Sequence, residues 1–384
     1  MNDILKIMKI LFCGTNVPDK IEYISPEISA AGNRYQNNLI RNLRHLGHEV
    51  HNLAYIGVKI ERYDENAAVL REESDYDYVY CSRKNIGIRA DAHRSYQQKM
   101  KAAVAECDVV ISYNIFHAWF DLPGIARNMG RRSIVFLADY TPPEGYTDLL
   151  HKEYAHIMLD SMKKYDLVVG LSENIRSMCS KRQRFILMEG GIDPAVYDYF
   201  EEKVPKVIDG RKVSFMYSGL LSKVTGVDTL LDSMKQQKRK DIRLIVTGKG
   251  DLENDVTAAA ADDPRIIYMG HLPYDAYMEQ LAAADVLINP RNMDLPENKN
   301  NFPSKIMDYL ASGRRIISTR FAGYERFSGY MEFCGSDAAS LASRISAVAD
   351  SIGNDQEMHI YGVNRNFAQN YLWPVQLERL LEIK

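Results

Sequence analysis

Residues 289–319 read NPRNMDLPENKNNFPSKIMDYLASGRRIIST, a pattern that predicts a strand end, a polar loop, a short helix and a second strand. Proline is favoured at the first position of a helix, so Pro303 marks where this helix begins. Glycine commonly stops a helix, and Gly313 follows the last turn. Four apolar residues repeat with the spacing of one helix face: Ile306, Met307, Leu310 and Ala311. The stretch therefore predicts a helix packed beside the strands of an α/β sheet.

The polar side of this helix suits a nucleotide. Lys305 and Asp308 are three residues apart, so both project from the same side. The free N–H groups and partial positive charge of a helix N-terminus favour a diphosphate. Asp308, one turn further along, is placed to accept hydrogen bonds from sugar hydroxyls. An amphipathic helix that only packs would give the same pattern, and the helix alone leaves both interpretations open.

Short apolar runs along the chain predict two parallel sheets, because parallel strands are buried on both faces. In the first half the runs lie at 8–12, 49–55, 108–113, 133–138, 166–171 and 185–188. In the second half they lie at 213–217, 242–247, 265–269, 286–289 and 315–318. Predicted helices alternate with them, among others at 34–46, 95–106, 227–237, 274–284, 303–312, 354–370 and 375–383. This alternation indicates right-handed β-α-β connections.

Polar residues follow several of the predicted strands. Ligand sites in open parallel sheets gather beyond the carboxyl ends of the strands, which is where Asp139 and His117 lie. Asp139 would serve equally well as a turn cap, and His117 has aromatic neighbours against which it would simply pack. The D-x-D pair Asp75 and Asp77 lacks the preceding hydrophobic strand that such a metal motif needs, so no metal site is predicted.

Composition excludes several classes of protein. The chain has 384 residues, enough for two or three domains, and its net charge of -3 gives no general attraction to nucleic acid. No apolar run is long enough to span a membrane, and the first residues lack the layout of a signal peptide. The five cysteines are scattered, which favours reduced thiols in a cytoplasmic protein over disulfides or a zinc site.

The run from Asn301 through Asp308 to Gly313 resembles the signature of GT-B glycosyltransferases of the large retaining family 4, also called group 1, in its polysaccharide-building branch. That family carries two glutamates eight positions apart, and the corresponding positions here hold Asn300 and Asp308. In the family the second acid binds the nucleotide ribose and the first contacts the donor sugar. Asp for Glu is a mild change, whereas Asn300 removes a charge near the reacting sugar.

The resemblance extends over nearly the whole chain. Residues 218–223 stand where the family grips the donor diphosphate with Arg and Lys, but Leu220 occupies the Arg position. Residues 247–250 match a G-x-G turn expected near the nucleobase, and a glycine-bearing loop in the first half is expected to face the donor phosphates. The resemblance implies catalytic roles for Asp139, Lys223, Asn300 and Lys305. It implies donor binding by Gly32, Gly219, Gly248, Gly250, Phe302, Pro303, Ser304 and Asp308.

The implied fold is α/β and of the GT-B class: two facing Rossmann-like domains with parallel sheets and a donor cleft between them. The expected domains are an acceptor-side domain at 1–203, a nucleotide-sugar-binding domain at 204–365, and a C-terminal helix at 366–384 that packs back on the first domain. The expected protein is cytoplasmic. A basic cluster of Arg83, Lys84, Arg89 and Arg94 motivates the hypothesis of weak peripheral attraction to anionic lipid on the inner face of the membrane.

The implied activity is metal-independent, retaining transfer of a hexosyl group from a UDP- or GDP-sugar to a glycan or lipid-linked acceptor in polysaccharide biosynthesis. It requires no cofactor and no nucleic acid partner. Two alternatives stay open. Leu220 and Asn300 would also fit a non-catalytic GT-B homologue that binds a glycan or a partner protein. A sugar-nucleotide epimerase of the same shape is less favoured, because the F-P-S-K helix is a transferase feature.

Overall fold

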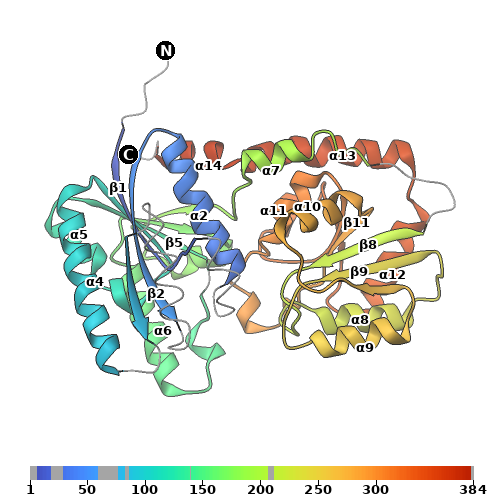
Figure 1. Cartoon of the computed structure of the whole chain (residues 1–384), viewed down its shortest axis with the longest axis horizontal. Coiled ribbons are helices and arrows are strands. Elements are labelled where there is room, and N and C mark those ends of the chain that lie inside the picture. The colour runs from blue at the N-terminus through green and yellow to red at the C-terminus, as the bar shows by residue number, and fades with distance from the viewer. Residues whose placement is uncertain are drawn as a thin grey trace, which may run out of the picture. The chain divides into compact units, whose positions relative to one another are not determined.

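The computed structural model describes residues 7–18, 29–58, 77–82, 86–138, 140–205 and 212–381. The chain divides into two compact units, Met1–Glu189 with Gln376–Lys384, and Gly190–Val375. Each unit contains one parallel sheet with helices on both faces (Figure 1). The division falls earlier in the chain than the boundary expected between 203 and 204, because residues 190–203 group with the second unit.

The first unit is built on a seven-stranded sheet in the order β3-β2-β1-β4-β5-β6-β7. All neighbouring strands run parallel, and β1 pairs with β2 from Lys9 opposite Glu49 to Gly14 opposite Ala54. The strands are β1 (Lys9–Gly14), β2 (Glu49–Val58), β3 (Asp77–Ser82), β4 (Val109–Tyr113), β5 (Arg132–Leu137), β6 (Leu167–Gly170) and β7 (Arg184–Leu187).

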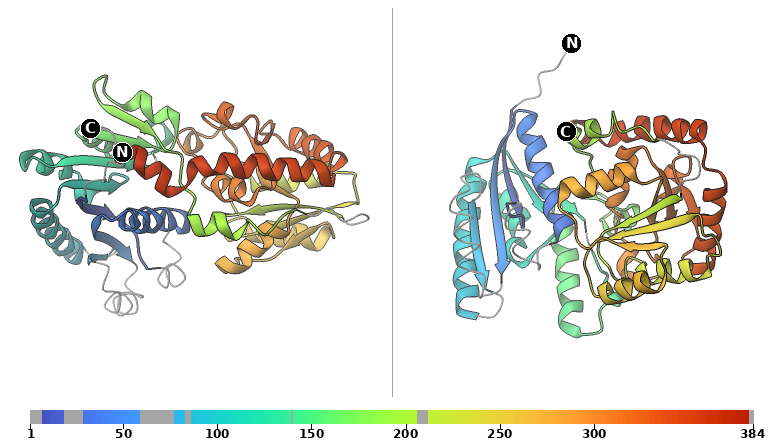
Figure 2. Two further views of the ribbon diagram at one scale, coloured as in Figure 1. Left: turned by 90° about the horizontal axis from the view of Figure 1, so that it is seen from above. Right: turned by 45° about the vertical axis from the view of Figure 1, so that its right-hand side comes forward.

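Helices cover both faces of this first sheet. They are α2 (Ala30–His45), α4 (Ile86–Glu106), α5 (Leu122–Asn128) and α6 (Leu149–Met162). The right-hand view of Figure 2 shows α2 and α4 on opposite faces. Alternate strand residues such as Leu11 and Leu53 pack against one face of α4, whose Tyr96 and Met100 are fully buried. This is the two-residue alternation that a sheet covered on both sides requires.

The second unit is built on a six-stranded sheet in the order β10-β9-β8-β11-β12-β13, again with parallel pairs. The strands are β8 (Val213–Ser218), β9 (Ile242–Thr247), β10 (Ile266–Tyr268), β11 (Val286–Asn289), β12 (Arg315–Thr319) and β13 (Glu332–Cys334). The helices are α7 (Pro194–Tyr199), α8 (Val227–Gln236), α9 (Glu253–Asp262), α10 (Tyr274–Ala283), α11 (Lys305–Ser312), α12 (Ala338–Asp350) and α13 (Asn354–Ala368). The last helix of the chain is α14 (Trp373–Leu381).

The helix predicted over 303–312 is present as α11, but it begins at Lys305. Pro303 and Ser304 form the turn before it, where Ile306 N–H donates to the Pro303 carbonyl over 2.9 Å. Gly313 ends the helix in the left-handed conformation, with a φ of 68°, as predicted. The four residues of the predicted apolar face are all buried.

A buried arginine fixes the C-terminal end of α11. The guanidinium of Arg365, on α13, donates to the carbonyl of Ala311 over 2.9 Å and to the carbonyl of Tyr197 over 2.8 Å. It also lies over the Tyr197 ring, 3.9 Å from its centroid. One side chain therefore joins α7, α11 and α13, and it holds α11 at a fixed position in the second unit.

The described parts of the chain contain no helix that is a candidate to cross a membrane. None of those helices combines the length and the apolar character that crossing a bilayer requires.

Replacing Arg365 with Met is expected to destabilise the protein by roughly 3 kcal/mol, because a buried carbonyl and a partly buried one lose a charged donor. Urea unfolding followed by far-UV circular dichroism measures the change. Arg344→Met is the matched control, because that half-exposed guanidinium pairs with Glu332 at the surface. It should cost less than about 1 kcal/mol. Equal losses in the two variants would contradict the role given to Arg365.

Candidate functional site

Polar and glycine-rich loops gather at the carboxyl ends of β8, β9 and β11 in the second unit. These loops begin at Gly219, Gly248 and Pro290, and the third one leads into α11. The carboxyl edge of an open parallel sheet is where ligands bind in this class of fold. Most of the residues that the sequence predicted for donor binding lie in these loops or in α11.

Two of the loops touch through their backbones. Gly219 and Gly248 have φ angles of +134° and +140°, which side chains other than glycine rarely adopt. A Cβ atom on Gly248 would lie 1.8 Å from the Gly219 carbonyl oxygen, and one on Gly250 would lie 2.2 Å from that of Leu221. Leu221 N–H donates to the Lys249 carbonyl over 2.9 Å. Close backbone packing alone therefore requires these glycines, whether or not a nucleobase lies nearby.

Hydroxyl groups hold the loop that follows β8. The carbonyl of Leu220 accepts hydrogen bonds of 2.6 Å from both Tyr217 Oη and Thr225 Oγ1. Leu220 is 56% exposed, so it places an apolar group at the position where the family resemblance led us to expect arginine. Lys223 lies in the turn before α8 and is exposed. Within the described residues, no hydrogen bond or ion pair joins the Lys223 side chain to the other predicted residues of this edge.

Lys305 has the most unusual environment at this edge. Its Nζ lies 3.9 Å from the centroid of the Tyr217 ring, and it is buried without a hydrogen-bond partner among the described residues. A Cβ atom on Gly219 would be 3.2 Å from this Nζ, so the ammonium faces the loop after β8. Burial lowers the pKa of Lys305 well below 10.5, and the positive charge of Arg291 lowers it further.

Arg291 is a residue that the sequence reasoning missed. It directly follows β11 and Pro290, and its Nη1 donates to Asn298 Oδ1 over 3.1 Å. Asn298 is fully buried and donates to the Val224 carbonyl over 2.7 Å, which ties this loop to the one after β8. The signal was present in the sequence, because a basic residue immediately after a buried strand lies at the carboxyl edge.

Asp308 lies in the first turn of α11, where the helix dipole favours a carboxylate. Its Oδ2 accepts a hydrogen bond of 3.0 Å from Tyr277 Oη on α10. The carboxylate is half-buried and keeps part of its surface open. Lys305 and Asp308 thus share one side of the helix but differ in their surroundings.

The residues in the loop before α11 differ in how deeply they are buried. Asn300 is buried, with 5% exposure, and Ser304 is exposed and makes no capping hydrogen bond through its side chain. The Phe302 ring packs against Phe321 and Phe327, with centroid distances of 5.3 and 5.8 Å. Phe302 is therefore part of the core, and only its backbone is available to a donor.

The predicted site residues of the first unit are less informative. Gly32 was expected in a loop, which was wrong: it lies in the first turn of α2, and its N–H donates to Ser29 Oγ over 3.3 Å. A Cβ atom there would make only ordinary contacts, the nearest at 3.4 Å. Asp139 lies outside the described residues, as do Arg83 and Lys84 of the basic cluster.

No metal centre is visible in the parts of the chain that the structure describes, where no three His, Cys, Asp or Glu side chains are grouped to hold an ion. Of the D-x-D pair only Asp77 is described, and it pairs with His51 over 3.2 Å and with Lys99.

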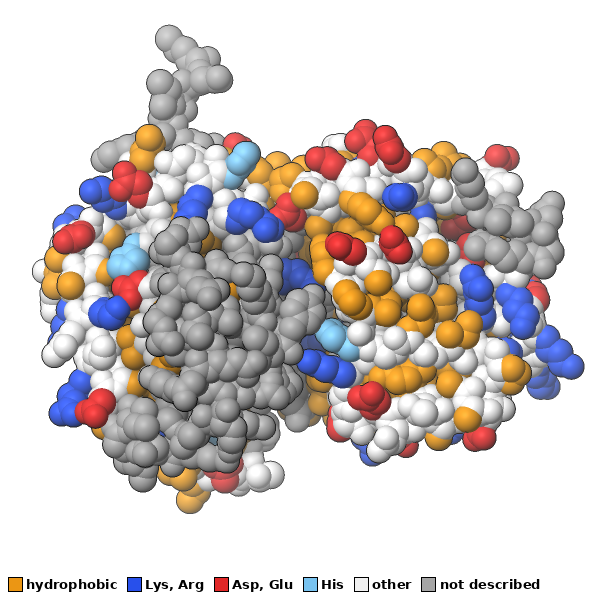
Figure 3. All heavy atoms as spheres, viewed as in Figure 1, with side chains coloured by type: hydrophobic (Ala, Val, Ile, Leu, Met, Phe, Trp, Pro, Cys, Tyr) orange, Lys and Arg blue, Asp and Glu red, His pale blue; other side chains and the backbone are white. Residues whose placement is uncertain are grey.

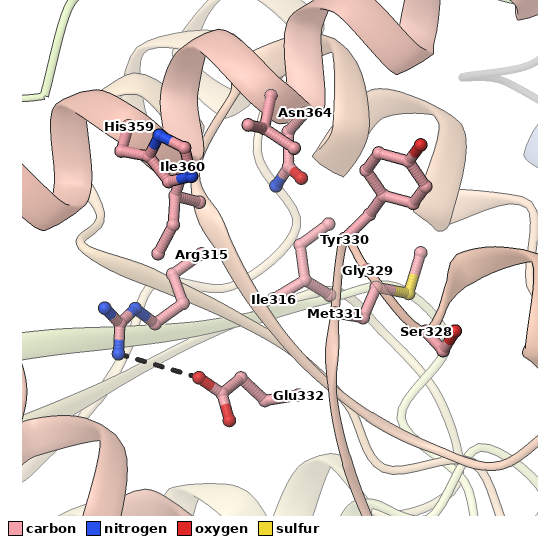
Figure 4. A pocket seen from close by; sticks show the side chains of 11 residues that line it. Arg315, Ile316, Ser328, Gly329, Tyr330, Met331, Glu332, His359, Ile360 and Asn364 are labelled. Atoms are coloured by element: carbon pink, nitrogen blue, oxygen red, sulfur yellow. Dashed lines mark ion pairs between the residues drawn. The ribbon is translucent and has the colours of Figure 1, made fainter.

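A cavity of about 270 Å³ elsewhere in the second unit is a second candidate site (Figure 4). Arg315, at the start of β12, lines it together with Glu332 and His359. The Arg315 guanidinium lies 2.8 Å from the Glu357 carboxylate and 3.7 Å from that of Glu332. Its charge is thus balanced by acids of the protein, so this cavity offers no net attraction to an anion.

Exposed hydrophobic side chains also occur in the second unit. Figure 3 shows hydrophobic side chains over much of its viewed face. Ile267 and Met269, at the edge strand β10, are 41% and 37% exposed. Gly270, next to Met269, accepts a hydrogen bond from Gly248 N–H, so this apolar edge adjoins the loop after β9.

A family model matches part of the second unit. Residues 212–351 match the model of the family described as "Glycosyl transferases group 1". This segment holds the three loops at the carboxyl edge and α11. No curated protein sequence matches the chain.

Solved glycosyltransferase structures share the fold over nearly the whole chain. Anabaena HepE in complex with UDP is 14% identical with a TM-score of 0.69, and the match covers 97% of this chain and 99% of that one. A glycosyltransferase from Rickettsia africae is 16% identical with a TM-score of 0.69, covering 98% of each chain. Sucrose-phosphate synthase from Thermosynechococcus elongatus is 13% identical with a TM-score of 0.68, covering 97% and 98%. These likenesses confirm the predicted fold class, two parallel-sheet α/β domains of the GT-B type.

Gly248→Ala is expected to destabilise the protein by more than about 2 kcal/mol, because it adds a backbone clash to an unfavourable φ. Gly270→Ala is the control: its φ is +66°, but a Cβ atom there meets nothing within 4 Å. It should cost only about 1 kcal/mol. Thermal unfolding of both variants measures the difference, and an unchanged melting point for Gly248→Ala would contradict the backbone contact.

Lys305→Met is expected to stabilise the ligand-free protein by about 0.5–2 kcal/mol, because it removes a buried amine that no described residue pairs with. The direction in which stability changes with pH follows from the lowered pKa of Lys305. The folded state loses this proton more readily than the unfolded state, so the wild type should gain stability as pH rises toward 10.5. The Lys305→Met variant should lack this gain in stability with rising pH. Thermal unfolding between pH 7 and 10 measures both, with the exposed Lys223→Met as control. A destabilised Lys305→Met would show that the ammonium is held favourably without ligand.

Proposed function

We propose that this protein is a retaining glycosyltransferase that moves a hexosyl group from a nucleotide-sugar donor to a glycan or lipid-linked acceptor, in polysaccharide biosynthesis. The observation that carries the proposal is the Lys305 ammonium at the carboxyl edge of the second sheet, which is buried and has no hydrogen-bond partner in the described parts of the chain. A buried cation without an anion is unfavourable, so its position indicates a negatively charged ligand. The match to group 1 glycosyltransferases and the UDP bound by Anabaena HepE support a nucleotide as that ligand.

A diphosphate fits this corner better than a single carboxylate. Lys305 and Arg291 provide two positive charges, and the N-terminus of α11 adds a partial positive charge. Arg291 thereby supplies a cation that the exposed Leu220 cannot supply. With these groups present, we propose that the reaction proceeds without a metal ion.

In the proposed reaction the bond between the sugar C1 and a diphosphate oxygen breaks, and a bond from an acceptor hydroxyl oxygen to C1 forms on the same face. The acceptor proton passes to the departing phosphate oxygen. Lys305, Arg291 and the α11 N-terminus stabilise the negative charge that develops on the leaving group. Lys223, in the exposed turn before α8, is a further candidate for this role.

Asp308 and Asn300 would divide the remaining donor contacts. We assign Asp308 to the ribose hydroxyls, because it lies one turn into α11 and keeps part of its carboxylate open. Along the helix axis it is about 5 Å from Lys305 at 1.5 Å per residue, close to the reach from diphosphate to ribose. We assign Asn300 to the sugar, where its amide can donate and accept hydrogen bonds but carries no charge.

A non-catalytic binding protein is the second candidate function. Two residues favour it, the neutral Asn300 and the exposed Leu220, because each replaces a charged group of the related enzymes. Such a protein would still bind a nucleotide sugar at Lys305 and Asp308. Donor hydrolysis and transfer assays across UDP- and GDP-sugars separate the two, since only the enzyme releases the nucleoside diphosphate.

Asp308→Asn is expected to weaken nucleotide binding roughly ten- to a hundred-fold, because a charged acceptor for a hydroxyl pair contributes about 1.5–3 kcal/mol. Calorimetry with UDP and GDP, each in the presence of a chelator, measures this. The apolar face of α11 is unchanged, so the variant should fold normally.

Asn300→Ala is the matched comparison for the sugar contact. It should leave the affinity for the bare nucleoside diphosphate unchanged and lower the affinity for the full nucleotide sugar. Equal nucleotide affinity of wild type and Asp308→Asn would end the ribose assignment. Loss of binding in chelator, restored by manganese, would overturn the metal-independent reaction.

A further inference from the structure

Basic segments precede three neighbouring strands of the first sheet. β5, β6 and β7 lie side by side and run parallel, so their amino ends share one edge. The segments that lead into them are residues 127–132, 160–166 and 180–184. They hold two aspartates and eight basic residues, which we call the basic edge: Arg127, Arg131, Arg132, Lys163, Lys164, Lys181, Arg182 and Arg184.

The basic edge is one surface rather than three separate turns. Arg127 Nη2 donates to the Lys164 carbonyl over 2.7 Å, which joins the segments before β5 and β6. Burial lowers the pKa of Arg132, and the charge of Arg184 lowers it further, so the segments before β5 and β7 are also close. Most of the eight residues are exposed to solvent: Arg127, Lys163, Lys164, Lys181, Arg182 and Arg184.

Acidic groups at this edge are fewer than basic groups. Asp160 pairs with Lys163 over 3.2 Å, and Asp166 accepts two hydrogen bonds of 2.8 Å from Ser133. Two further acids precede the neighbouring strand β4: Glu106 and Asp108. If each of these four acids neutralised one basic residue, half of the basic edge would still keep its charge. The edge therefore attracts a partner that presents many negative charges.

Exposed apolar side chains lie at the same edge. Met129 is 41% exposed, and it lies between Arg127 and Arg131 in the segment before β5. Ile7 is 62% exposed just before β1, and β4 alone separates β1 from β5 in the sheet. Basic residues beside exposed apolar ones are typical of proteins that bind the interface of an anionic bilayer.

A groove of about 330 Å³ adjoins the basic edge. It lies beside α4 and α5, and Lys164 belongs both to its lining and to the basic edge. The side chains that line it include two amines, one carboxylate, an amide and two apolar groups: Lys101, Lys164, Asp121, Asn128, Phe120 and Ile125. Ammonium groups next to apolar side chains suit a phospholipid where its phosphate meets its acyl chains.

We propose that the basic edge binds the surface of a bilayer that contains anionic phospholipid. Headgroup phosphates supply the negative charge, and Met129 and Ile7 enter the interface between headgroups and acyl chains. Single-stranded nucleic acid is also a polyanion, but its bases stack on aromatic side chains. The one aromatic residue of the three segments, Tyr165, is buried. This surface is distinct from the basic cluster at 83–94, and it does not depend on the donor site or on the proposed function.

Co-sedimentation of the full-length protein with vesicles tests the proposal. The protein should bind vesicles of phosphatidylcholine with one-third phosphatidylglycerol at low salt, and it should not bind phosphatidylcholine alone. High salt should weaken the binding, because it screens the charges. Failure to bind either kind of vesicle would overturn the proposal, and so would equal binding to both.

Two triple variants locate the surface. Lys164→Gln, Lys181→Gln and Arg182→Gln together remove three charges from the basic edge, and vesicle binding should fall more than about tenfold. The matched control removes three exposed charges from the second unit, by Lys212→Gln, Lys238→Gln and Lys240→Gln. It should change binding less than about twofold. Equal losses would show an effect of net charge alone and would overturn the assignment. UDP affinity should be unchanged in both, so a failure of the donor site is recognised separately.

Met129→Trp separates lipid from nucleic acid. Its fluorescence should shift to shorter wavelength with the anionic vesicles, because the indole enters an apolar region. The native Trp119 and Trp373 are buried and should give a constant background. A single-stranded oligonucleotide at the same salt should produce no such shift. The lipid assignment would be overturned if the vesicles left the emission unchanged, or if the oligonucleotide bound more tightly than the vesicles.

Discussion

The ammonium of Lys305, buried over the ring of Tyr217, is the constraint on which the account of the second unit depends. Burial raises the pKa of Tyr217 to about 12, so the ring stays neutral and offers the ammonium only its face. That contact is much weaker than a bond to an anion. The loop after β8 can lie this close to Lys305 because position 219 has no side chain. The site is thus arranged in advance, and its electrostatic compensation is left to a ligand.

Much of the fold could be predicted from the sequence, because buried parallel strands give continuous apolar runs and the helix stops are marked by glycine. Strands β1, β2 and β4 to β12 appear close to their predicted positions. β3 was missed because its segment, Asp77–Ser82, is short, contains two tyrosines and begins and ends with a polar residue, at the edge of the sheet. The first turns of α4 were missed because residues 86–94 do not show the apolar spacing of a helix face.

Candidate site residues could be predicted from the sequence where residue type and spacing indicate the same role. Prediction was less successful where backbone geometry decides the position of a residue. Lys305 and Asp308 share one side of α11, as their spacing indicated. Only the structure shows that Lys305 is buried with no hydrogen-bond partner among the residues described, and that Asp308 accepts a hydrogen bond from Tyr277. Phe302 matched a family signature but serves the core, which a motif cannot distinguish. Arg291 carries no motif, and its importance follows from three-dimensional proximity to Lys305. Gly32 was misplaced because Ser29 caps α2 earlier than the glycine signal implied.

The side-chain pKa of Lys305 is the most direct test of the central claim, that this buried cation waits for a diphosphate. Selective ¹³C labelling of lysine Cε, assigned with a Lys305 substitution, allows its titration by NMR in the full-length protein with and without UDP. The account predicts a pKa well below 10.5 in the free protein and a marked rise when UDP is bound. A pKa near 10.5 in the free protein, or one that UDP leaves unchanged, would contradict it.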